Sequence, residues 1–143
     1  MKKIVERGRI IVKQSEDKAC KISITTTVDG DETQATRKGS LRLSFAENVI
    51  SYTEENAFIT ITIRADEVEI VRNGDYSMFL PLKRDTKTRG EIGINGAIGA
   101  VDIKTSRLLY STTDTSLMLS VHYDLLFGEE KQAMQIRLLA RYI

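Results

Sequence analysis

The sequence has little of several residue types that carry chemistry. Its 143 residues include one histidine, one cysteine and one proline, and no tryptophan. A single cysteine excludes an internal disulfide and is typical of proteins kept in a reducing compartment. One histidine and one cysteine, far apart in the chain, cannot supply the ligands of a structural zinc site. The sequence therefore predicts no metal site and no cofactor, and it favours a cytoplasmic location.

Long apolar runs and a strong net charge are also missing. The longest early apolar run, 10–12, is shorter than the roughly 7–15 residues of a signal-peptide core, and nothing approaches the roughly 20 of a membrane-spanning helix. Lys and Arg number 21 against 20 Asp and Glu, a formal charge of +1. We therefore expect neither a membrane nor a specific nucleic acid as partner. The basic clusters in 1–21 and 83–89 are interpreted as solvated strand ends and a loop.

What the sequence has in abundance is alternation of apolar and polar residues. Period two is typical of a strand with one buried face, because successive side chains point to opposite sides. The pattern predicts ten strands, at 20–28, 33–45, 49–53, 58–64, 67–72, 76–82, 88–94, 97–105, 117–127 and 132–142. Residues 9–12 fit one further short strand, and 108–111 fit either a short strand or a continuation.

Turn residues separate these runs. Asp29-Gly30, Asn73-Gly74 and Asn95-Gly96 predict tight hairpins, since glycine and asparagine accept the positive φ that type I′ turns require. Residues 132–142 contain good helix formers, but their unbroken alternation favours a strand. The single proline, Pro81, cannot donate to a strand ladder and predicts an edge, a bulge or a rim.

The connections are short enough for hairpins, and this decides the fold class. A meander of about ten twisted strands would expose two long edges unless it closed on itself. The sequence therefore predicts an all-β fold, a single antiparallel calycin-like (lipocalin-like) barrel of about 8–10 strands with mainly hairpin connections. Residues 1–143 form one domain, in which 1–17 is either a loosely attached N-terminal strand or an arm.

The order of landmarks from Thr33 onward resembles the YwiB-like family of β-barrels in the calycin superfamily. The landmarks that carry the resemblance are Gly39-Ser40-Leu41, Ser51-Tyr52-Thr53-Glu54, Val71-Arg72-Asn73-Gly74, Ile103-Lys104-Thr105, Val121-His122-Tyr123-Asp124-Leu125 and a final amphipathic strand. The resemblance implies an antiparallel barrel. It implies no activity, because the function of that family is unknown.

No motif of catalysis emerges from the residues. Ser120, His122 and Asp124 share one face of a strand, but residues two apart project in parallel, about 6.6 Å apart, whereas a catalytic triad must converge. We interpret them as the polar outer face of the barrel. Cys20 falls on an apolar face and is expected to be an inert buried thiol. The sequence favours a protein that is not an enzyme and singles out no catalytic residue.

The one inward charge is Arg72, which shares a face with Val68 and Ile70. A buried guanidinium needs a partner, and a bound carboxylate or phosphate would pair with it; alternatively, Arg72 lies at the rim and meets water or a protein carboxylate. Tyr123 and Tyr52 are its candidate companions. The leading hypothesis is therefore a barrel that binds a small hydrophobic, amphipathic or anionic molecule. The competing hypothesis is a structural or interaction barrel with a filled core, whose partner docks on an edge strand or on the basic segment 83–89. The oligomeric state, a homodimer included, stays open.

Overall fold

The computed structural model describes residues 2–3, 12–13 and 16–143. It contains twelve strands, and within these residues no helix is long and apolar enough to cross a membrane. The strands are β1 (Lys2–Lys3), β2 (Val12–Lys13), β3 (Lys18–Val28), β4 (Asp31–Arg42), β5 (Asn48–Glu54), β6 (Ala57–Ile63), β7 (Glu67–Gly74), β8 (Tyr76–Lys83), β9 (Lys87–Ile94), β10 (Ala97–Thr112), β11 (Ser116–Phe127) and β12 (Glu130–Tyr142).

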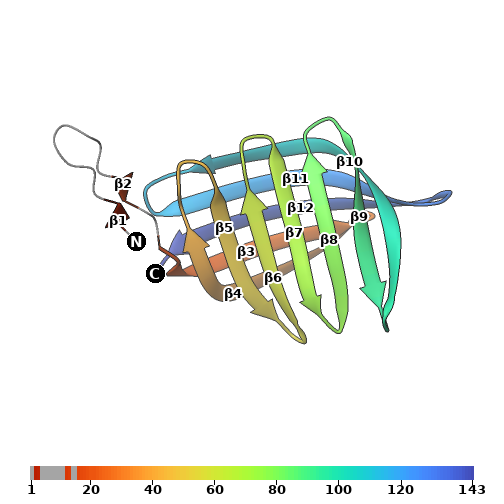
Figure 1. Ribbon diagram of the computed structural model, residues 1–143, viewed down its shortest axis with the longest axis horizontal. Helices are drawn as coiled ribbons and strands as arrows, with labels where there is room; N and C mark the ends of the chain where they lie inside the picture. The colour runs from red at the N-terminus through yellow and green to blue at the C-terminus, as the bar shows by residue number, and fades with distance from the viewer. Residues whose placement is uncertain (1, 4–11, 14–15) are drawn as a thin grey trace.

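Strands β3 to β12 form one closed antiparallel barrel of ten strands (Figure 1). Each strand pairs with its neighbours in sequence, and β12 pairs with β3 to close the ring. The predicted closed meander is therefore confirmed, and 132–142 forms a strand because β11 and β3 both supply backbone partners. β1 and β2 pair with each other in a separate two-stranded sheet. The predicted strand at 9–12 lies mostly outside the described residues.

The barrel has two unlike walls. The long wall consists of β10, β11, β12, β3 and β4, with 11–16 residues per strand, and the short wall consists of β5 to β9, with 7–8 residues. In Figure 1 the short strands cross in front of the long ones. β4 pairs with β5 only over Gly39–Arg42, so residues 31–38 project beyond the short wall.

Alternating side chains from all ten strands meet in one core. A buried aliphatic side chain of this size stabilises the fold by about 1.5–3 kcal/mol. The largest fully buried side chains come from both walls and are Ile22, Leu41, Ile50, Ile63, Val68, Leu80, Leu82, Ile103, Leu108, Leu117, Leu119 and Leu138. Both walls therefore depend on the same core.

Two of the three predicted tight turns form as expected. Asp29 and Gly30 have φ of 49° and 89°, and Asn95 and Gly96 have 51° and 82°. At Asn73-Gly74 the predicted hairpin forms between β7 and β8, but the predicted type I′ turn is wrong, since both residues extend β7 and pair with β6. A Cβ on Gly74 would lie 2.0 Å from the Asn56 carbonyl oxygen. This glycine is needed for close approach of two backbones rather than for a turn.

Two irregularities shape the neighbourhood of β10. Residues 108–111 continue β10, after a bulge between Thr105 and Arg107. The β8–β9 ladder ends at the Phe79–Glu91 pair, just before Pro81, which lacks a donor. Pro81 thus lies at the end of a ladder, in the kind of position that its chemistry predicts.

Candidate functional site

The three candidate site residues all face the barrel interior. Tyr52 is 7% exposed, Tyr123 is 3% exposed and Arg72 is 6% exposed. Tyr52 lies on β5 between Gly39 and Ile59, and Arg72 is the cross-strand partner of that Ile59 on β7. Tyr52 and Arg72 are therefore two strands apart, and both lie toward the end of the barrel that carries the β5–β6 and β7–β8 turns.

Arg72 has its partners within its own hairpin. Its Nη1 lies 2.8 Å from Asp75 Oδ1 and donates to the Tyr76 carbonyl oxygen at 2.7 Å, while its guanidinium stacks 3.6 Å from the centre of the Tyr76 ring. Hydrogen bonding from Arg72 lowers the pKa of the Asp75 carboxyl, which therefore stays ionised at neutral pH. A ligand anion at Arg72 would have to compete with this carboxylate.

The two tyrosines, in contrast, have no partner for their hydroxyls. Neither hydroxyl makes a hydrogen bond within the described part of the chain. Burial, together with the Glu54 carboxylate and against the opposing effect of Arg37, raises the pKa of Tyr52 to about 12. Burial, and then the charge of Tyr52, raises the pKa of Tyr123. The two phenols are therefore close enough to interact, and both are protonated donors at neutral pH.

A second inward arginine escaped the sequence reasoning. Arg37 lies on β4 on the same face as Leu41 and Gly39, and its buried Nε has no hydrogen-bond partner in the described residues. Following the alternation backward from Leu41 would have found it. The signal is weak because 31–38 is polar on both faces.

Thr105 is the fourth polar group of this region. It is 1% exposed, its Oγ1 has no partner in the described chain, and it lies directly opposite Tyr123 beside the β10 bulge. Bulges re-aim side chains and are frequent next to binding sites. We refer to Arg37, Tyr52, Thr105 and Tyr123 as the inner polar cluster.

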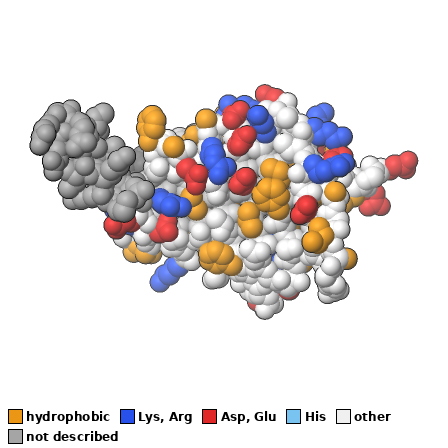
Figure 2. All heavy atoms as spheres, viewed as in Figure 1, with side chains coloured by type: hydrophobic (Ala, Val, Ile, Leu, Met, Phe, Trp, Pro, Cys, Tyr) orange, Lys and Arg blue, Asp and Glu red, His pale blue; other side chains and the backbone are white. Residues whose placement is uncertain are grey.

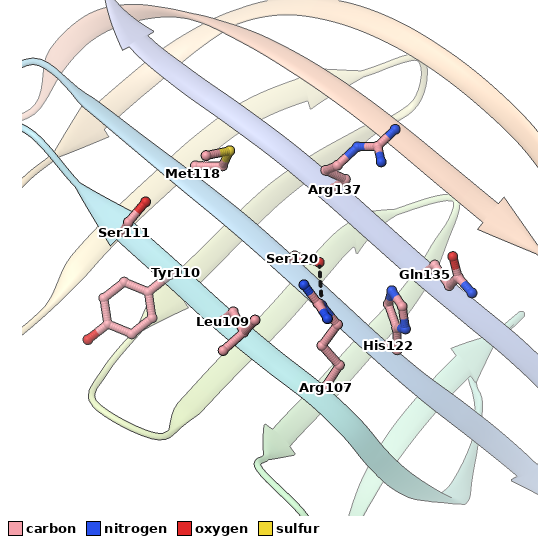
Figure 3. Close-up of a pocket in the computed structure, with 9 residues that line it drawn as sticks. All are labelled: Arg107, Leu109, Tyr110, Ser111, Met118, Ser120, His122, Gln135 and Arg137. Atoms are coloured by element: carbon pink, nitrogen blue, oxygen red, sulfur yellow. Dashed lines mark hydrogen bonds between the residues drawn. The ribbon is translucent and has the colours of Figure 1, made fainter.

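Ser120, His122 and Asp124 lie on the outer face of β11, as predicted, and form no catalytic arrangement. Ser120 Oγ accepts a hydrogen bond from Arg107 Nε at 3.2 Å, and within the described residues no hydrogen bond joins it to His122 (Figure 3). Partial burial, and then the Arg107 charge, lowers the pKa of His122. Ser120, His122 and Arg107 line a shallow outer hollow of about 560 Å³.

The remaining reactive groups lack the surroundings of a site. Cys20 is fully buried, and burial raises the pKa of its thiol, so the thiolate is disfavoured. Among the described residues, no group of three or more His, Cys, Asp or Glu side chains could hold a metal ion. The inner polar cluster is the better candidate site, because two of its buried donors lack a hydrogen-bond partner in the described residues.

Comparison with known proteins agrees with the fold. The crystal structure of the ywiB protein from Bacillus subtilis superposes with a TM-score of 0.80 at 13% sequence identity, covering 91% of this chain and 96% of that one. No curated protein matches the chain. Residues 10–138 match the family model described as a domain of unknown function, DUF1934. The resemblance to YwiB-like proteins is thus confirmed, and the chain belongs to the DUF1934 family.

Proposed function

We propose that the barrel binds a small amphipathic molecule whose acidic head is held by the inner polar cluster. The observation that carries this proposal is the pair of buried donors without a hydrogen-bond partner in the described residues, Arg37 Nε and Thr105 Oγ1. Buried polar groups usually have a partner, and leaving one unsatisfied costs about 1–3 kcal/mol. A ligand that accepts hydrogen bonds would remove that cost.

The composition of the cluster indicates the chemistry of the head group. Arg37 Nε, Thr105 Oγ1 and both phenols can donate, and Arg37 carries a charge. The complementary group is rich in acceptors and negatively charged, such as a carboxylate or a phosphate. Arg72 adds a second guanidinium toward the same end, already balanced by Asp75.

Apolar side chains around the cluster suit the rest of such a molecule. Half-buried Met78 on β8, Ile92 on β9, and Met134 and Ile136 on β12 pack against the core. Methionine is unbranched and adapts to irregular shapes. The likeness of the barrel to calycins in shape supports a binder, although shape alone does not identify a ligand.

The experiment measures binding of three probes, laurate, dodecyl phosphate and dodecanol, by isothermal titration calorimetry. We expect laurate or dodecyl phosphate to bind at least about tenfold more tightly than dodecanol, a difference of about 1.4 kcal/mol. Arg37→Gln and Tyr123→Phe should each remove most of this preference. Tyr110→Phe, an inward tyrosine elsewhere on β10, is the matched control.

The stability of Tyr123→Phe separates a ligand role from a structural one. Because the hydroxyl has no hydrogen-bond partner in the described residues, its removal should leave the melting temperature of the free protein unchanged or raised. Equal binding of laurate, dodecyl phosphate and dodecanol would refute the proposal. So would a Tyr123→Phe variant that loses stability but keeps full affinity.

The alternative, an interaction barrel, gains no support from the basic segment 83–89. Lys83 faces Glu67, Lys87 and Arg89 both face Asp102, and Arg84 donates to the Leu108 carbonyl oxygen. The basic side chains of this segment therefore already have partners within the molecule. A free cationic surface lies instead on the long wall.

A further inference from the structure

Five basic side chains gather on the outer face of the long wall. Strand register places Lys38, Lys21 and Arg141 directly side by side on β4, β3 and β12. Arg137 lies four residues before Arg141 on the same face of β12, opposite Ser120 of β11, and Arg107 lies opposite His122. We call this surface the cationic face.

The charges of the cationic face are not neutralised by their neighbours. Within residues 16–143, none of the five forms a salt bridge. Two carboxylates lie beside these cations, Glu32 in one of the hollows and Asp124 next to His122 on β11. Five cations against two carboxylates give this group a formal charge of +3, in a chain whose total is +1. The positive electrostatic potential of the molecule is therefore concentrated on the long wall.

The same face is hollowed. A depression of about 560 Å³ runs past Leu109, Met118 and Arg137 (Figure 3), and another of about 300 Å³ runs past Lys21, Leu139 and Arg141. Leu139 of the second lies directly opposite Met118 of the first. The two depressions thus adjoin and form a trough across β10, β11, β12 and β3.

The row formed by Lys38, Lys21 and Arg141 destabilises the fold through repulsion between like charges. Like charges directly opposite on neighbouring strands are destabilising, and Lys21 has such a neighbour on each side, Lys38 and Arg141. A sequence that keeps an arrangement against its own stability is often serving a binding site. An acidic partner would reverse the sign of this interaction.

The trough is open to solvent, and this favours an extended chain over a small molecule as the partner. Leu109 is 49% exposed and Met118 is 51% exposed. Sites for small molecules enclose most of the ligand surface, which this open trough cannot do. An extended chain lying across several strands would cover it.

The side chains also discriminate between kinds of chain. Proteins that hold single-stranded nucleic acid stack its bases on aromatic rings. Of the tyrosines that line these hollows, Tyr110 packs against the core, and Tyr142 is covered by the Lys18 ammonium, 5.3 Å from the ring centre. Leu109, Met118 and Leu139 instead suit aliphatic side chains.

We propose that the cationic face docks an extended acidic segment of a partner protein, with carboxylates on the basic residues and aliphatic side chains in the trough. The proposal is independent of any ligand inside the barrel. The positive charge of the cationic face complements a negatively charged segment, and such complementarity speeds the encounter of two proteins.

His122 provides an internal probe of this contact. It lies within the trough, faced by Arg107 from β10, by Arg137 from β12, by Glu32 from β4 and by Asp124 on its own strand. Burial and Arg107 hold its pKa below the usual value. A docked carboxylate would raise that pKa, which proton NMR of the imidazole reports directly.

The test uses fluorescein-labelled peptides that repeat Glu-Glu-Leu, Glu-Glu-Ser or Lys-Lys-Leu, together with an oligothymidylate. A peptide of about eight extended residues is long enough to cross the strands of the trough, which lie about 4.8 Å apart. Fluorescence anisotropy should show that the Glu-Glu-Leu peptide binds most tightly and that raising salt from about 50 to 300 mM weakens it. The pKa of His122 should rise in the complex.

Charge reversal provides the matched variants. Lys21→Glu and Arg137→Glu should each weaken Glu-Glu-Leu binding at least about tenfold. Lys83→Glu, the same change on the short wall, should leave it unaltered. Melting temperatures of all three variants show that they are folded.

Three results would overturn the proposal. Tighter binding of oligothymidylate than of the acidic peptides would assign the face to nucleic acid. Equal effects of Lys21→Glu and Lys83→Glu would show that the face is not the site. Equal binding of the Glu-Glu-Leu and Glu-Glu-Ser peptides would remove the apolar trough from the contact.

Discussion

The two walls of the barrel contribute to the same core but present different outer surfaces. On the short wall, outward charges lie in pairs, with Arg64 between Glu47 and Glu69 and Lys83 facing Glu67. In Figure 2, which views that wall, charged side chains of both signs surround apolar ones. On the long wall, the five cations of the cationic face lie around a trough and form no salt bridge within residues 16–143. Both walls therefore contribute to stability, whereas the proposed docking of an acidic partner involves the long wall alone.

The largest expected effect tests whether the core is shared. Leu119 on the long wall and Leu80 on the short wall are both fully buried, so Leu119→Ala and Leu80→Ala should each lower the free energy of unfolding by about 2–5 kcal/mol. Urea denaturation measures both. Leu109→Ala, outward and half-exposed, should change it by less than about 1 kcal/mol. A loss confined to one wall would contradict a single core.

Glycine substitutions should separate crowded backbone positions from open ones. Gly74→Ala on the short wall places a Cβ against the Asn56 carbonyl oxygen and should cost about 1–3 kcal/mol. Gly99→Ala on β10 meets no atom within 4 Å and should be neutral or stabilise by about 0.4–1 kcal/mol. Thermal unfolding of the two variants gives the comparison, and similar losses for both would contradict it.

Charge reversal at the centre of the cationic row should stabilise the fold. Lys21→Glu replaces two opposed like-charge pairs, with Lys38 and Arg141, by two attractive ones, and each is worth about 0.2–1 kcal/mol. The gain should shrink in high salt. Lys83→Glu should be slightly destabilising instead, because it faces Glu67. A lower melting temperature for Lys21→Glu would show that the row is not under repulsion.

The smallest effect concerns the pH response of the long wall. Because the pKa of His122 is lowered in the folded state, its stabilising contribution is complete above pH 6.5 and is lost as the pH falls through the folded pKa. Arg107→Gln should raise this pKa only part of the way toward 6.5, since burial is the larger cause. Proton NMR titration measures it, with Arg89→Gln as a control that leaves it unmoved. An unchanged pKa in Arg107→Gln would exclude the Arg107 contribution.

The ten barrel strands were predictable because each carries its own alternation and most turns carry their own chemistry. Even β12, built from good helix formers, follows its pattern, since two partner strands satisfy its backbone. The Asn73-Gly74 prediction failed because the deciding contact, with Asn56, comes from another hairpin. Local sequence does not contain that information.

The residues of the candidate sites likewise divide into those that the local sequence reveals and those that it does not. Tyr52, Arg72 and Tyr123 were found because apolar neighbours reveal which way they face. Arg37 was missed because its strand segment is polar on both sides. The cationic face was beyond reach, because Lys21 and Arg141 become neighbours only through the register between the first and last barrel strands.

That register also determines when the protein can fold. β12 pairs with β3 along nine residue pairs, and the Ile143 amide donates to the Ala19 carbonyl oxygen at 3.1 Å. While the chain is being synthesised, β3 stays unpaired on one side, because its partner β12 emerges from the ribosome after all the other barrel strands. The nascent barrel therefore exposes two open edges until β12 is free to pair with β3, and this interval is when it is most vulnerable to aggregation.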